Sequence, residues 1–109
     1  MNPHHRGGDE IEKFLTWLRV ERGRATNTVD SYRRDLSRAA AWLAARRSSL
    51  SGASGSDLSA FVAHLQSSGE AASSTARRLA ALRMFYGFMV AENLIATDPT
   101  THLEGVRVA

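Results

Sequence analysis

The chain has 109 residues, of which 43% are hydrophobic and 23% charged, the size and composition of one folded domain. It contains no cysteine, which excludes disulfide frameworks, thiolate zinc sites and cysteine nucleophiles. No apolar stretch is long enough to span a membrane and residues 1–8 lack the apolar core of a signal peptide, so we expect a cytoplasmic protein. The net charge is +3, and Lys13 is the only lysine among the cations. Arginine suits phosphates and guanine edges, although arginine-rich chains are also typical of GC-rich genomes.

Hydrophobic side chains recur at intervals of three and four residues in four segments, which is the spacing of one helical face. Residues 1–8 precede these segments and are expected to form a disordered tail. Ser56 is the expected N-cap of the third helix, and Gly69 is expected to end it. The helices are predicted over residues 9–21, about 26–47, 57–68 and 73–93.

The fourth segment is apolar nearly all round, which is typical of a central, buried helix. Residues 100–103 are expected to add one short helical turn after it. We find no strand pattern and no internal repeat. The predicted fold is therefore an all-α four-helix bundle with short connections, forming a single domain over residues 9–107.

Few side chains could support catalysis. His64 and His102 stand alone, and no histidine has the spacing to a second ligand that a metal site in a bundle needs, so neither a metal nor a cofactor is expected. Tyr32 precedes Arg33 and Arg34, which places a phenol next to two guanidiniums, an arrangement that a phosphoryl-transfer site could use. The helical spacing nevertheless assigns Tyr32 to the apolar stripe, so we expect it at the edge of the core.

Two predicted helix starts share a design that suits phosphate. Each opens with hydroxyl or amide side chains and presents two adjacent arginines within two turns. Free N–H groups at a helix start, hydroxyls and arginines all donate hydrogen bonds to nucleic-acid phosphates, and arginine also reads guanine in the major groove. The pattern predicts a grip on duplex DNA if both starts lie on one surface. The simpler interpretation is that the hydroxyls cap the helices and the arginines are solvated.

The same residues resemble those of Xer-type tyrosine recombinases. Residues 26–36 (TNTVDSYRRDL) are similar to the family's NT-x-x-x-YRRDL block, and residues 73–86 (SSTARRLAALRMFY) to its SS-x-AR-x-LSA-x-R-x-FY block. Residues 93–100 resemble the N-x-DP exit from the same domain. The resemblance covers about residues 9–107 and is nearer to the XerD than to the XerC branch.

The resemblance implies the core-binding domain of such a recombinase, an orthogonal four-helix bundle of SAM-like type that forms half of a clamp around a recombination site. It implies that the second and fourth helices face the major groove. Arg83 lies on the apolar side of its helix, so it is also expected to cover the core edge or to pair with an acid. The implied DNA-binding residues, with Arg38 added from the polar side of the second helix, are Thr26, Asn27, Thr28, Arg33, Arg34, Arg38, Ser73, Ser74, Thr75, Arg77, Arg78 and Arg83.

The catalytic domain of the family, with its tyrosine nucleophile, is absent from the chain, so we expect this part to bind DNA without cleaving it. The resemblance implies a parent protein that exchanges DNA strands through a phosphotyrosine intermediate as part of a tetramer of recombinase subunits, in chromosome dimer resolution. Three alternatives stay open. They are a protein-interaction module that docks partners on its first and fourth helices, the DNA-binding domain of a phage or integron integrase, and an independent helix-turn-helix regulator.

Overall fold

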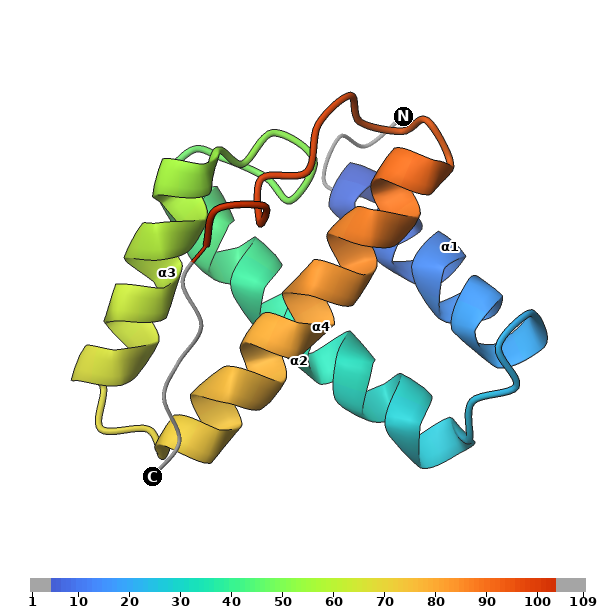
Figure 1. The fold of residues 1–109 in the computed structure, drawn as a ribbon, viewed down its shortest axis with the longest axis horizontal. Coiled ribbons are helices and arrows are strands. Elements are labelled where there is room, and N and C mark those ends of the chain that lie inside the picture. Colours follow the sequence, from blue (N-terminus) through green and yellow to red (C-terminus); the bar gives the residue numbers. More distant parts are fainter. Residues whose placement is uncertain (1–4, 104–109) are drawn as a thin grey trace.

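Four helices make up the fold of residues 5–103, the part of the chain that the computed structural model describes, with side chains from Asp9 onwards. No strand occurs among these residues, so the predicted all-α class is confirmed. In Figure 1, α2 and α4 cross at the centre of the bundle, and α1 and α3 lie on either side of the crossing. The helices are α1 (His5–Val20), α2 (Thr26–Ala45), α3 (Gly55–Ser67) and α4 (Ala72–Ala91).

The helix at the amino-terminal end begins earlier than predicted. Because α1 starts at His5, residues 5–8 are helical and do not form the expected tail. Residues 1–4 of that tail and residues 104–107 of the predicted domain lie outside the described residues. After α1 the chain turns at Gly23, whose φ of +62° lies in the left-handed region that glycine adopts without strain.

The two long helices both end two residues before the predicted position, in Schellman motifs. At the end of α2, Arg47 adopts a φ of +63° and the Ser48 N–H donates to the Leu43 carbonyl at 2.8 Å. At the end of α4, Asn93 adopts a φ of +59° and the Leu94 N–H donates to the Met89 carbonyl at 2.9 Å. These hydrogen bonds satisfy helix carbonyls that would otherwise lack a partner.

The N-caps differ from those predicted. Ser54 caps α3, whereas the predicted cap, Ser56, lies inside the helix; the Ser54 hydroxyl accepts from the Asp57 N–H and the Asp57 carboxylate accepts from the Ser54 N–H, both at 3.0 Å. Ala25 and Ala71 occupy the cap positions of α2 and α4, and no side chain caps either helix. The hydroxyl groups expected to cap these two helices stand instead in their first turns.

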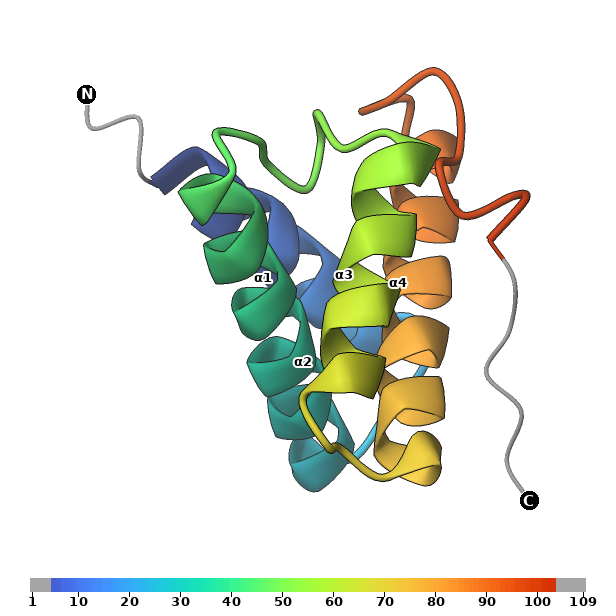
Figure 2. The ribbon, with the colours of Figure 1, turned by 90° about the vertical axis from the view of Figure 1, so that its left-hand side faces the viewer.

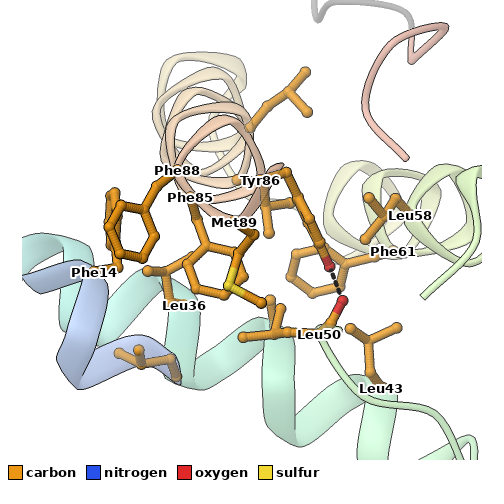
Figure 3. Close-up of a cluster of buried hydrophobic side chains, with 14 of the residues drawn as sticks. Phe14, Leu36, Leu43, Leu50, Leu58, Phe61, Phe85, Tyr86, Phe88 and Met89 are labelled. Carbon is orange, nitrogen blue, oxygen red and sulfur yellow. Dashed lines mark hydrogen bonds between the residues drawn. The ribbon is translucent and has the colours of Figure 1, made fainter. Parts of the chain in front are cut away.

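The core gathers around α4, as its apolar sequence predicts. The Phe14 ring of α1 meets the Phe85 ring edge to face, with ring centroids 5.6 Å apart. On the other side of α4, the buried Tyr86 hydroxyl donates to the Leu50 carbonyl at 2.6 Å (Figure 3). α4 buries Thr75, Leu79, Ala81, Leu82, Phe85, Tyr86, Phe88 and Met89.

The segment after α4 folds back onto the bundle. Thr100 and Leu103 are buried, and the Leu103 N–H donates to the Thr100 carbonyl at 3.1 Å, which closes the short turn predicted over residues 100–103. The Arg83 guanidinium donates to the Leu103 carbonyl at 2.9 Å. Arg83 therefore fastens this segment to α4, a core-edge position of the kind its place on the helix predicts.

Candidate nucleic-acid interface

The two predicted phosphate-binding helix starts lie at the same end of the bundle, on opposite sides of the point where α2 and α4 cross (Figure 1). Figures 1 and 2 both place the first turns of α2 and α4 at the same end of the molecule. A hollow of about 410 Å³ lies between the helices. Its lining residues are Asn27, Thr28, Ser31, Tyr32 and Asp35 from α2 with Arg77, Ala80 and Ala81 from α4. The hollow therefore joins the start of α2 to the second and third turns of α4, and the hydroxyl residues of the first α4 turn are not part of its lining.

The polar side chains at the start of α2 are open to solvent. Thr26, Asn27 and Thr28 are exposed, and the first helical hydrogen bond of the turn is that from the Val29 N–H to the Ala25 carbonyl. The N–H groups ahead of Val29 therefore have no acceptor within the helix, which leaves them available to an anion.

The three hydroxyl residues at the start of α4 differ in their exposure to solvent. Ser73 is exposed and Ser74 is half-buried. Thr75 is buried, and its hydroxyl donates to a Glu70 carboxylate oxygen at 3.1 Å. Thr75 thus helps to fix the loop before α4 and presents no free donor to the surface.

The two arginines in the middle of α2 are held differently. Arg33 donates from Nε and Nη2 to the two carboxylate oxygens of Glu12 on α1, both at 3.0 Å, and from Nη1 to Asp30 at 2.9 Å. These contacts join α1 to α2, and the hydrogen bond from Arg33 holds the pKa of Glu12 below its ordinary value. Arg34 is exposed and has no hydrogen-bond or ion-pair partner among the described residues.

Three further arginines converge on two acids, a group we call the acid–arginine cluster: Asp35, Glu70, Arg38, Arg77 and Arg78. Arg78 donates to Asp35 at 2.6 Å and to both Glu70 oxygens at 3.0 and 3.1 Å. Arg77 donates to the two Asp35 oxygens at 3.2 and 3.3 Å. Arg38 donates to Glu70 at 3.0 Å. The hydrogen bond from Arg78 is the main reason that the pKa of Glu70 lies below its ordinary value.

The sequence interpretation missed the two acids of this cluster. Asp35 is only 5% exposed, and it follows the apolar-stripe residue Tyr32 by three positions. A carboxylate at the edge of a core stripe requires a cation or hydrogen-bond donors nearby, and this requirement could have identified Asp35 from the sequence. Glu70 lies in the short α3–α4 connection, where sequence spacing gives no face.

The tyrosines and histidines take structural or surface positions. Burial raises the pKa of the Tyr86 phenol, which therefore stays protonated. Tyr32 is half-buried, edge to face with Phe14 at 5.7 Å, as predicted for a core-edge residue. His64 is exposed and lies beside the Trp42 ring. Within residues 9–103, no three histidine or acidic side chains are grouped closely enough to hold a metal ion.

A second hollow, of about 740 Å³, lies between α1 and the end of α4. Trp17 and Phe88 contribute its aromatic side chains, and Val20 and Leu94, which are 66% and 42% exposed, lie along it. Its remaining lining residues are Asp9, Glu12, Lys13, Thr16, Glu21 and Glu92. We call this the α1–α4 groove; its acidic lining distinguishes it from the arginine-rich surface of α2 and α4.

Comparison with known proteins gives one consistent set of relatives. Residues 11–93, which include every residue of the α2 and α4 surface, match the phage integrase N-terminal SAM-like domain. Tyrosine recombinase XerD of Rhizobium meliloti (strain 1021) is 46% identical over 99 residues, and that of Agrobacterium fabrum is 43% identical over 102 residues. Tyrosine recombinase XerC of Herpetosiphon aurantiacus is 37% identical over 100 residues.

These alignments cover 91%, 94% and 91% of this chain but only 32%, 31% and 33% of the three relatives, so the chain spans about a third of their length. No solved structure gives a significant match. Among the described residues, no helix combines the length and the apolar character needed to cross a membrane.

Proposed function

Because the chain belongs to the phage integrase N-terminal SAM-like domain family, we propose that it binds duplex DNA through the surface shared by α2 and α4. The observation that most directly supports this proposal is the hollow that Asn27 and Thr28 of α2 line together with Arg77 of α4. Exposed hydroxyl and amide donors, uncapped helix starts and arginines are the groups that hold phosphates in protein–DNA complexes. An α-helix also fits the major groove of B-DNA, where arginine recognises guanine.

The contacts of the free domain divide the candidate residues by role. We assign the DNA contacts to the polar residues of the two first turns and to the arginines that keep exposed donors. Arg33 donates three hydrogen bonds to two acids, and Arg78 is largely buried between two acids. Thr75 is buried and Arg83 is held by a carbonyl, so we assign these four residues to the support of the surface. The proposed contact set is Thr26, Asn27, Thr28, Arg34, Arg38, Ser73, Ser74 and Arg77.

For the whole protein, we propose a tyrosine recombinase in which this domain holds the recombination site while a separate catalytic domain exchanges the DNA strands. The XerD and XerC names of the relatives favour chromosome dimer resolution over the integration of a phage or integron. Such a protein would act as an assembly of recombinase subunits on DNA.

A salt titration tests the DNA proposal. The affinity of the domain for a short duplex is measured at several salt concentrations, for the natural sequence and for Arg34→Ala/Arg77→Ala. Each phosphate contact contributes roughly −0.9 to the slope of log affinity against log salt, so the double variant should bind more weakly with a slope shallower by about one to two units. Arg46→Ala is the matched control, since Arg46 is an exposed arginine at the other end of α2. Equal affinities and slopes for the double variant and the natural sequence would reject the proposal.

We also propose that the α1–α4 groove contacts another protein subunit. Two large hydrophobic side chains, Val20 and Leu94, are exposed along this groove, and burial of such side chains favours association. Sedimentation of the domain with and without Val20→Ser/Leu94→Ser tests this second function. Self-association that the double variant abolishes is expected for a groove that binds a second subunit of the same kind. A monomer at every concentration would exclude that kind of contact.

A further inference from the structure

We propose that Asp35 and Glu70 restrain Arg38 and Arg77 in the free domain, and thereby limit how tightly it binds DNA of arbitrary sequence. This inference rests on the proposed function, since it concerns the same surface. It assigns the two acids a part in the specificity of binding that goes beyond holding the helices together.

One arginine of the acid–arginine cluster is a structural anchor. The Arg78 side chain is only 16% exposed and contacts both acids, Asp35 at 2.6 Å and Glu70 at 3.0 Å. It joins α4 to α2 and to the α3–α4 connection at once. Its removal would leave two largely buried carboxylates with less compensation, so Arg78 is required for the cluster to exist.

The other two arginines are placed to exchange partners. The side chains of Arg77 and Arg38 are 53% and 40% exposed, and each contacts a single acid. A guanidinium has five N–H donors, and Arg77 uses two of them at 3.2 and 3.3 Å while Arg38 uses one at 3.0 Å. Both therefore have unused donors on the solvent side, and both could move to a phosphate while Arg78 keeps the acids compensated.

The acids also set the charge that DNA meets. Asp35 lines the hollow between α2 and α4 itself, beside Arg77. A phosphate that approaches Arg77 therefore meets a carboxylate behind the guanidinium and has to compete with it. Neutralising either acid should strengthen binding to any duplex, because it removes a repulsive charge and releases an arginine for one more phosphate contact.

The test compares two isosteric variants with a matched control. Affinity for a short duplex of arbitrary sequence is measured against salt for Asp35→Asn, Glu70→Gln and Asp30→Asn. Asp30 is the control because it lies on the same helix and pairs with Arg33, outside the cluster. We expect Asp35→Asn and Glu70→Gln to bind about three- to tenfold more tightly at low salt, with slopes steeper by about one unit. Thermal unfolding establishes that each variant is folded, and if Asp35→Asn is not, Glu70→Gln with Arg38→Ala provides the same comparison.

A double-mutant cycle separates this effect from a general change in charge. If Asp35 acts through Arg77, the gain from Asp35→Asn should be lost in an Arg77→Ala background. Weaker or unchanged binding by both acid variants, or a gain no larger than that of Asp30→Asn, would overturn the inference. Arg34→Ala, which is outside the cluster, is measured in parallel. If it leaves affinity unchanged, the proposed function fails; if it weakens binding while the acid variants do not strengthen it, only the inference fails.

Discussion

Arg33 and Arg34 are adjacent in the chain, yet only Arg33 is held by carboxylates, with two hydrogen bonds of 3.0 Å to Glu12 on α1. Substitution of the two residues should therefore affect different properties, stability for Arg33 and DNA affinity for Arg34. Arg33→Ala should lower the free energy of unfolding by about 0.5–1 kcal/mol, the range for an exposed ion pair of good geometry. Arg34→Ala should leave stability within about 0.5 kcal/mol of the natural sequence and weaken duplex binding instead.

Urea unfolding and DNA affinity, measured on both variants, separate the two roles. Glu12→Gln is the control for Arg33→Ala, because it removes the same ion pair from the other side. If Arg33→Ala loses as much DNA affinity as Arg34→Ala without losing stability, the division of roles between the two residues is wrong.

Leu79 lies fully inside the bundle on the central helix α4. Leu79→Ala should lower the free energy of unfolding by about 2–5 kcal/mol, because it removes buried methyl groups and leaves a cavity. Leu94→Ala removes the same groups from an exposed position and should change stability by less than about 0.5 kcal/mol. Similar losses for the two variants in urea unfolding would contradict the placement of α4 at the centre of the core.

The hydroxyl of Tyr86 makes one buried hydrogen bond, to the Leu50 carbonyl. Tyr86→Phe keeps the ring in the core but leaves that carbonyl without this donor, so the free energy of unfolding should fall by about 1–3 kcal/mol. DNA affinity of the folded variant should not change, since Tyr86 is buried in the second half of α4, away from the first turns of α2 and α4. A folded Tyr86→Phe variant with natural stability would show that the carbonyl finds another donor.

The capping of α3 distinguishes two serines that are two positions apart. Ser54→Ala removes the side-chain cap and should cost about 0.5–2 kcal/mol, the usual effect at an N-cap. Ser56→Ala, at an exposed position inside the helix, should be neutral or slightly stabilising, because alanine is the better helix former. Thermal unfolding of the two variants checks the assignment, and a larger loss for Ser56→Ala would move the helix start to the position first predicted.

Stability should fall as the solution is acidified below about pH 5. The pKa values of Glu12 and Glu70 are both lowered in the folded domain from the ordinary 4.5, chiefly by hydrogen bonds from Arg33 and Arg78. Near and below pH 4.5 the unfolded chain therefore binds more protons at these two sites than the folded domain does, which favours unfolding. Urea unfolding between about pH 6 and about pH 3 should show this loss, and it should be smaller in Glu70→Gln. An equal pH dependence in that variant would mean that Glu70 contributes nothing to it.

The four helices and the central place of α4 could be predicted because burial of apolar side chains dominates folding and imposes its own spacing on the sequence. The exact residues at which the helices start could not be predicted. An N-cap preference is worth only about 1 kcal/mol, so packing of the helix faces overrides it, and Ala25 and Ala71 take the cap positions despite the neighbouring hydroxyls.

The partner of each arginine also could not be predicted from the sequence. Helical spacing tells on which side of its own helix a residue stands, but the partner comes from elsewhere in the fold. Arg33 meets Glu12, which lies 21 positions earlier, and Arg77 meets Asp35, 42 positions earlier. Only the packed structure could therefore divide the candidate arginines into those that support the surface and those that keep donors exposed.

The central claim is that DNA lies across the first halves of α2 and α4. An amide NMR titration of the domain with a short duplex at low salt tests it most directly, because it reports on every backbone position at once. The account predicts that the largest shifts fall in residues 26–38 and 73–81, with little change along the α1–α4 groove. Shifts concentrated on α1 and the end of α4, or no shifts at any duplex concentration, would contradict it.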